Sequence, residues 1–159
     1  MITCCHCVAN IVSTRIIHVG SNNLRPDRSF QPRDKQNYKL LLRALLAISS
    51  CIAKILAGSI FKRKDISDAL VQDANMQIKS AVDEVSGEGG GSKPETVSFL
   101  EQPAILSKRH LIDHGHLNKE GYRIWDRVLS EKVRERTNNI ENEYLVFVLA
   151  SFHTFNTNA

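Results

Sequence analysis

Two short motifs carry the residue types that nucleophilic catalysis uses. One is the D-H-G-H-L-N run at residues 113–118, and the other is the G-S-N-N run at residues 20–23. An imidazole beside a carboxylate can activate a hydroxyl group, because the ring takes the hydroxyl proton while the carboxylate fixes the ring's tautomer. The alternative interpretation is a loop histidine with a local turn acceptor, and an Asn-Asn pair in a left-handed turn. Each motif alone is a weak signal, so the surrounding elements decide its weight.

Three apolar runs are predicted to be strands that position these motifs. Residues 11–20 (I-V-S-T-R-I-I-H-V-G) are rich in β-branched side chains and lead into the G-S-N-N turn. Residues 51–60 are a short apolar run closed by a Gly-Ser pair, which predicts a buried strand. Residues 96–100 (T-V-S-F-L) predict a third strand, followed by a long loop that ends in D-H-G-H-L-N. Both motifs therefore lie in loops that follow strands, where open α/β sheets place function.

Apolar residues at helical spacing predict a helix after each of these strands. Asp34, Ser67 and Asn118 are the candidate N-caps, because short polar side chains accept hydrogen bonds from free backbone N–H groups at a helix start. The three apolar faces contain, in chain order, Tyr38, Leu41, Leu42, Leu45 and Ile48; Val71, Ala74, Ile78, Ala81, Val82 and Val85; and Tyr122, Trp125, Val128, Leu129 and Val133. The last helix closes with Arg134 and Arg136, whose charges suit a helix C-terminus.

The alternation of strands and helices predicts an α/β fold with a parallel sheet covered by helices on both faces. We expect one domain over residues 13–136, with a flexible Gly-rich loop at 87–94 and an atypical leader at 1–12. Residues 137–159 are a C-terminal extension. Its apolar run at 144–152 fits an added edge strand, a short helix or an unplaced apolar segment.

Length and composition agree with a single globular domain. The chain has 159 residues, of which 42% are apolar and 24% are charged. No apolar run reaches the roughly 20 residues that a membrane-spanning helix needs, so we expect no membrane span. The N-terminus lacks the basic start and long apolar stretch of a secretory signal. Cytoplasmic placement is the default expectation.

Positive charge is concentrated in the first 64 residues, which hold eleven Lys and Arg against two Asp. This segment could contact an anionic partner, but its charges are interleaved with turn formers rather than with aromatic residues that stack on bases. The basic side chains that could make such a contact are Arg25, Arg28, Arg33, Lys35 and Lys39. A solvated surface is the favoured interpretation, so nucleic acid is not expected as a partner.

Three of the four cysteines, Cys4, Cys5 and Cys7, cluster around His6. Structural zinc sites pair their ligands as C-x2-4-C and complete four ligands with a second pair, and the chain has no second pair nearby. We therefore expect no metal site and no cofactor. The role of this cluster is left open.

The order and context of the two motifs resemble those of the SGNH (GDSL-type) ester hydrolases. That family has a G-x-N-D loop after a central strand and a D-x-x-H-L-N loop before its C-terminal helix. Residues 54–63 resemble the strand between them that ends in a small-residue turn, and residues 73–75 (D-A-N) have the matching place on the next helix. The resemblance covers residues 15–136. It implies a flavodoxin-like three-layer α/β/α fold whose N-terminal strand and helix are missing from this chain.

The resemblance assigns roles to three residues. His116 would be the general base, Asp113 the carboxylate that orients it, and Asn22 an amide donor to the oxyanion. The family's serine lies in a G-D-S segment upstream of the G-x-N-D loop, and this chain has no such segment, so no nucleophile is assigned. Asn23 stands where the pattern has Asp. In the D-H-G-H-L-N run, His114 is a second imidazole beside His116.

These features predict a truncated SGNH-type hydrolase that is weakly active or inactive alone, with a small ester or acylated molecule as its substrate. One alternative is a non-catalytic module that binds ligands in the same cleft. Another is a nucleic-acid contact through the basic N-terminal third. The missing first strand would leave an exposed sheet edge, which predicts marginal stability or self-association.

Overall fold

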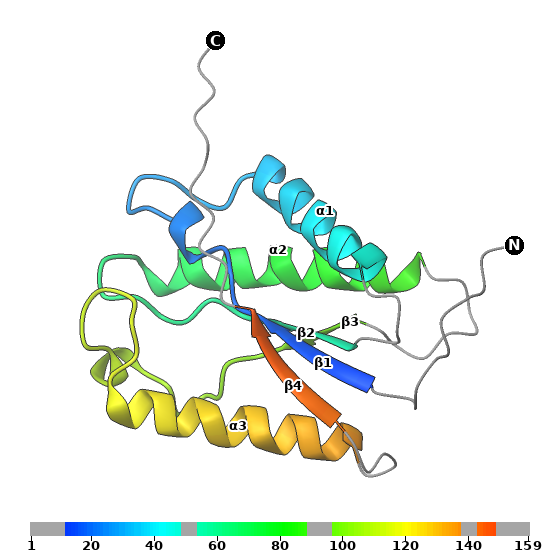
Figure 1. The fold of residues 1–159 in the computed structure, drawn as a ribbon. Helices are drawn as coiled ribbons and strands as arrows, with labels where there is room; N and C mark the ends of the chain where they lie inside the picture. The colour runs from blue at the N-terminus through cyan, green and yellow to red at the C-terminus, as the bar shows by residue number, and fades with distance from the viewer. Residues whose placement is uncertain (1–11, 49–53, 89–96, 138–142, 149–159) are drawn as a thin grey trace, which may run out of the picture.

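The computed structural model describes residues 12–48, 54–88, 97–137 and 143–148, and these form an α/β fold (Figure 1). Strands and helices alternate along the chain, and every strand pair is parallel. Within the described residues the sheet has four strands, in the order β3-β2-β1-β4. The strands are β1 (Val12–Ile17), β2 (Lys54–Gly58), β3 (Val97–Leu100) and β4 (Glu143–Val148).

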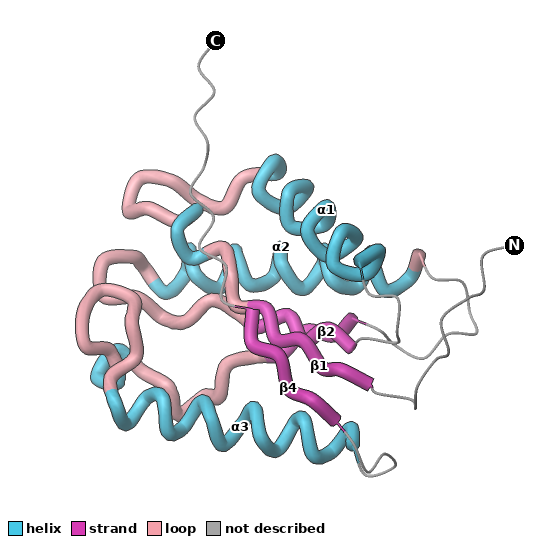
Figure 2. Tube along the Cα trace, in the orientation of Figure 1, coloured by secondary structure: helices cyan, strands magenta, loops and turns pink. Residues whose placement is uncertain are grey.

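Three helices cover the two faces of the sheet. Helices α1 (Pro32–Ile48) and α2 (Asp68–Gly87) lie on one face, and α3 (Lys119–Thr137) lies on the other (Figures 1 and 2). The strand order explains this division. The chain moves in one direction from β1 through β2 to β3 and then crosses back to β4, so right-handed crossovers place α3 opposite α1 and α2. The predicted parallel α/β sheet between helix layers is confirmed.

The position beside β1 is occupied by β4, which pairs with β1 along its whole length, from Val12↔Glu143 to Ile17↔Val148. Of the structures considered for the 144–152 run, the protein adopts the strand. The outer edges of the described sheet are therefore β3 and β4, and self-association through an edge stays a prediction.

Two of the three predicted helix N-caps, Ser67 and Asn118, are confirmed, and the third, Asp34, is not. The Ser67 side chain accepts from the Leu70 amide and caps α2 as predicted, and Asn118 Oδ1 accepts from the Gly121 amide at the start of α3. Asp34 is not an N-cap, because α1 already begins at Pro32, whose fixed φ suits a first helical position. Its carboxylate instead reaches back to accept from the Gln31 amide at 2.9 Å.

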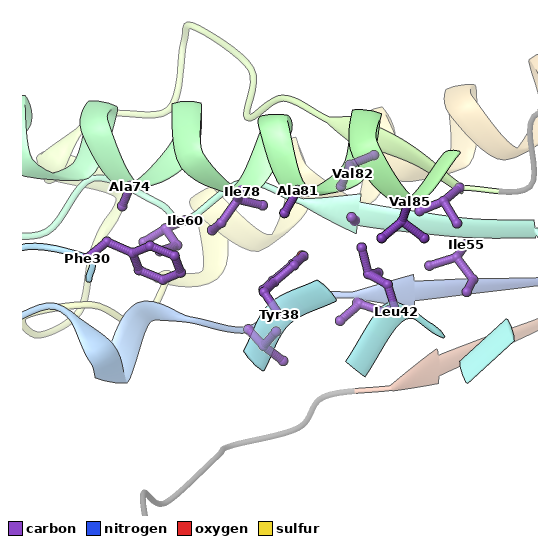
Figure 3. Packing of buried hydrophobic residues seen from close by; sticks show 14 of the residues in the cluster. Phe30, Tyr38, Leu42, Ile55, Ile60, Ala74, Ile78, Ala81, Val82 and Val85 are labelled. Carbon is purple, nitrogen blue, oxygen red and sulfur yellow. The ribbon is translucent and has the colours of Figure 1, made fainter. Parts of the chain in front are cut away.

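The α1–α2 face of the sheet holds the larger hydrophobic core (Figure 3). Every residue of the predicted α2 face is buried, together with Tyr38 and Leu42 of α1. Ile48, at the end of the predicted α1 face, is exposed instead because the helix ends there. Ion pairs of Glu84 with Lys35 and Lys39 join the outer surfaces of the two helices.

The α3 face holds a second core, built around Trp125 and Leu129 with Val128 and Val133 at its margin. Tyr122 was predicted to point into this core and does not. Its side chain is 57% exposed because it lies in the first turn of α3, beyond the carboxyl ends of the strands. It lines a cleft there.

Several predictions fall on residues that the structure does not describe. They concern most of the 1–12 leader with its three cysteines, residues 89–94 of the Gly-rich loop, and the tail beyond residue 148. Among the described helices, none combines the length and the apolar character that crossing a membrane requires.

Candidate functional site

A cleft of about 670 Å³ brings the two sequence motifs together. Its walls include Asn22 from the loop after β1, and Asp113 and His116 from the loop before α3. The loops meet because β1 and β3 are parallel strands of one sheet, so their carboxyl ends open at the same edge. The strand order reverses at β1, whose following loop lines the cleft, and such a switch point is the usual ligand position in open α/β sheets.

The G-S-N-N loop makes one tight turn that separates the roles of its two asparagines. Gly20 has a φ of 104°, a conformation that side chains disfavour, and the next three residues form a single 3-10 turn. Asn23 Nδ2 donates to Asp34 Oδ1 at 2.7 Å, so this side chain anchors the loop to α1. Asn22 is exposed, lines the cleft, and has no hydrogen-bond partner among the described residues. Its amide is therefore available to a ligand.

Asp113 organises the other loop through three hydrogen bonds. Its Oδ1 accepts from the amides of Gly115 and His116 at 2.9 and 2.8 Å, and its Oδ2 lies 2.7 Å from Nδ1 of His116. The two backbone donors, followed by the His116 ring, hold the pKa of Asp113 well below its usual range. The carboxylate is thus ionised at neutral pH and accepts the Nδ1 proton of His116.

This geometry selects His116 over His114 as the working imidazole. With Nδ1 engaged by Asp113, the lone pair of neutral His116 is on Nε2, and the side chain is 77% exposed at the cleft. The His114 ring also lines the cleft, but the carboxylate of Asp113 pairs with His116. The loop is fixed at His114 through its carbonyl, which accepts from the Lys64 amide at 3.0 Å.

Arg63 connects the loops of Asn22 and His116, although no motif in the sequence marks it. Its Nη1 donates to the Ser21 carbonyl at 2.6 Å, and its Nε and Nη2 form a two-point contact with the carboxylate of Asp65. The aliphatic part of the same side chain lies beside Gly115. Arg63 therefore spaces the Asn22 loop from the His116 loop. In the sequence it stands within a K-R-K run that resembles any charged loop.

An aromatic wall formed by His18, Phe61 and Trp125 lines the cleft on the α3 side. The rings of His18 and Phe61 are 4.3 Å apart between centroids, and Phe61 meets Trp125 edge-on at 5.1 Å. Nδ1 of His18 is buried without a hydrogen-bond partner. This burial lowers the pKa of His18 to about 4, so the ring is neutral near pH 7. A single histidine on an apolar strand gives no sequence signal that separates packing from binding.

The described serines do not supply a nucleophile in hydrogen-bond contact with His116. Ser67 caps α2, and buried Ser59 accepts from the Gln102 amide at 2.8 Å. Ser21 lines the cleft within the 3-10 turn, not in a strand-to-helix elbow. Across the part of the chain that the structure describes, no group of three His, Cys, Asp or Glu side chains is placed to hold a metal ion.

Several basic residues of the N-terminal third make internal ion pairs. Arg28 contacts Asp34, Lys35 and Lys39 contact Glu84, and Arg43 contacts Glu88. These contacts give the nucleic-acid alternative no added support.

No protein-family model, curated protein or solved structure matches this chain. The resemblance to SGNH hydrolases therefore rests on the residues of the two loops and on the order of the elements that carry them.

Proposed function

We propose that this protein is an SGNH-type ester hydrolase-like domain that binds an uncharged ester and supplies the base, the orienting carboxylate and one oxyanion donor for its cleavage. The observation that carries the proposal is the 2.7 Å contact between His116 Nδ1 and Asp113 Oδ2, in a cleft that Asn22 also lines. A parallel α/β sheet with both loops at its carboxyl edge is a scaffold on which such a site can be built.

The arrangement supports a simple proton path. His116 Nε2 takes the proton of a hydroxyl group as that oxygen attacks the ester carbonyl, and the imidazolium is stabilised by ionised Asp113. The amide of Asn22 donates to the carbonyl oxygen as it becomes negative. The proton then passes from His116 to the departing alkoxide, which leaves as an alcohol. Because no described serine is bonded to His116, the attacking hydroxyl in this scheme is that of water, and turnover is slow.

The test compares His116 with the neighbouring imidazole. Purified protein is assayed with para-nitrophenyl butyrate as wild type, as His116→Ala and as His114→Ala. We expect slow hydrolysis above the buffer rate, its loss in His116→Ala and its retention in His114→Ala, which shares the loop and the cleft. A wild type no faster than buffer, or equal losses in both variants, would overturn the proposal.

A fluorophosphonate probe tests the absence of a serine nucleophile separately. We expect no labelling, because the described part of the chain places no serine against His116. Strong labelling that disappears in His116→Ala would refute the water mechanism, and peptide mapping of the label would identify the serine.

A non-catalytic binding role is the second candidate, favoured by a well-formed cleft without a described nucleophile. It predicts saturable binding of an ester with hydrolysis at the buffer rate. That pair of results would replace the catalytic proposal with this one.

A further inference from the structure

The aromatic wall of the cleft contains a polar group that the proposed hydrolysis does not use. His18 follows β1 and lines the cleft together with Phe61 and Trp125. Its ring is held from several sides, by Phe61 at 4.3 Å and by the edge of Trp125 at 6.3 Å between centroids. An imidazole packed in this way is fixed in orientation.

Gly58 at the end of β2 makes room for this ring. A Cβ atom added at Gly58 would lie 3.3 Å from His18 Nδ1 and 3.3 Å from the Ile17 carbonyl oxygen. Those distances are tighter than ordinary van der Waals contact. The glycine thus lets Nδ1 sit against the backbone of β2, where it is buried and finds no donor or acceptor.

Burial of Nδ1 determines what the other nitrogen offers. A buried N–H without an acceptor is a rarer arrangement than a buried acceptor without a donor, so we assign the proton of the neutral ring to Nε2. His18 lines the cleft and Nδ1 is its enclosed nitrogen, so Nε2 is the nitrogen left to meet a ligand. The wall then presents one fixed donor among apolar groups. Its neutral state offers no positive charge to a carboxylate.

The surroundings of His18 suit an uncharged apolar group. Ile16, Leu117 and Leu129 line the same side of the cleft as Phe61 and Trp125. A volume of about 670 Å³ is within the range of pockets that enclose ligands of drug size and far exceeds the needs of an acetyl group. A few polar groups within an apolar pocket usually set a ligand's orientation.

We propose that the His18–Phe61–Trp125 wall is a subsite for the aryl or alkyl part of an uncharged ligand, and that His18 Nε2 donates to an acceptor oxygen carried on that part. The inference deepens the proposed function and rests on it for the ester, but binding in this subsite does not require the His116 base. The subsite favours ligands with an ether, hydroxyl or second ester oxygen in their apolar portion over purely hydrocarbon ones.

Two nearly isosteric uncharged probes test the donor directly. para-Methoxytoluene has an acceptor oxygen where para-ethyltoluene, which carries no other polar group, has a methylene. Trp125 is the single tryptophan of the chain, so its indole N–H signal in a proton–nitrogen correlation spectrum reports binding at this wall. We expect both probes to shift the signal saturably, with the methoxy compound bound about 3- to 10-fold more tightly, the effect of one net hydrogen bond.

Two variants complete the test. His18→Phe keeps a ring against Phe61 but removes the donor, and we expect it to bind both probes equally. Tyr38→Phe removes an equally buried and unpartnered polar atom from the opposite face of the sheet, and it should keep the preference. Equal affinities in the wild type, or no saturable shift of the Trp125 signal, would overturn the subsite whether or not the His18 variant folds.

The outcomes separate this inference from the proposed function. A methoxy preference in a protein that does not hydrolyse para-nitrophenyl butyrate would leave the subsite standing and remove the hydrolase. Hydrolysis that depends on His116, without any preference between the probes, would support the hydrolase and refute the subsite.

Discussion

The two faces of the sheet are built for different purposes. The α1–α2 face holds the larger cluster of buried side chains, which are mostly aliphatic and include the rings of Phe30 and Tyr38 (Figure 3). The α3 face has fewer aliphatic residues, a ring cluster and the cleft. Among the described residues, Tyr38 Oη on the first face, and His18 Nδ1 and Ser98 Oγ on the second, are buried polar atoms without a hydrogen-bond partner. The comparison teaches that a closed core stabilises the sheet while the open one leaves space for a ligand.

The largest expected effect is on the closed face. Ile78→Ala removes a fully buried side chain of α2 and should lower the free energy of unfolding by about 4 kcal/mol. Leu129→Ala, on α3 beside the cleft, should lower it by only about 2 kcal/mol, because the space it vacates joins an existing opening. Urea unfolding of both variants measures the difference. Equal losses would show that the α3 face is packed as tightly as the other.

The next effect is a loss of stability in acid that originates at His18. Unfolded His18 binds a proton near pH 6.5, whereas burial holds its folded pKa at about 4. Between these values the unfolded state binds more protons, so stability falls as the pH falls from 6.5 to 4, by up to about 3 kcal/mol.

Unfolding curves at pH 7, 5.5 and 4 for the wild type and His18→Phe isolate this contribution. The variant should lose less stability on acidification than the wild type does. Parallel losses in the two proteins would mean that His18 is accessible to protons in the folded state.

A third change loosens the connection between the faces. Asn75 on α2 accepts from the Ile60 amide at 2.7 Å and donates to the Ile60 carbonyl at 3.0 Å, just before Phe61 enters the aromatic wall. Asn75→Ala should lower the free energy of unfolding by about 1–2 kcal/mol and weaken binding of both aryl probes. Asn75→Asp keeps the acceptor and should recover part of the loss. If a destabilised Asn75→Ala protein binds the probes as the wild type does, the aromatic wall does not depend on its connection to α2.

The smallest expected effect is at Tyr38. Its hydroxyl is buried without a partner, and this burial raises the pKa of the phenol above its ordinary value. Tyr38→Phe removes a desolvated polar group while keeping the ring, so the free energy of unfolding should change by less than about 1 kcal/mol, toward greater stability. A clear destabilisation in thermal unfolding would show that the hydroxyl has a partner in solution.

The elements that the sequence predicts best are those with a strong period and a local cap. Helix α2 has both, since Ser67 caps it and each predicted apolar position is buried. The prediction of Asp34 as the N-cap of α1 was wrong. Asp34 lies within the first turn, where its carboxylate accepts a hydrogen bond from the Gln31 amide just before the helix, and Pro32 was the stronger signal for the helix start. The position of β4 in the sheet could not be predicted, because an unbroken apolar run does not indicate which strand it pairs with.

The part of the candidate site that could be predicted from the sequence consists of residues within short motifs. Asp113 and His116 are three residues apart, so their contact follows from one loop, and Asn22 lines the same cleft because parallel strands end at one edge. Arg63 and His18 could not be found in this way. Their roles depend on carbonyl oxygens, rings and a glycine from segments 40 or more residues away, which only the folded sheet brings together.

The pairing of β1 with β4 has a consequence for the order of folding. The paired residues are separated by about 130 positions, the greatest separation between paired strands in the sheet. Closing so long a loop is entropically slow compared with forming the local β1–α1–β2 unit. During synthesis β1 leaves the ribosome long before its second neighbour exists, so its amide and carbonyl groups on that side must wait for β4. Chaperone protection of the nascent chain matters most during that interval.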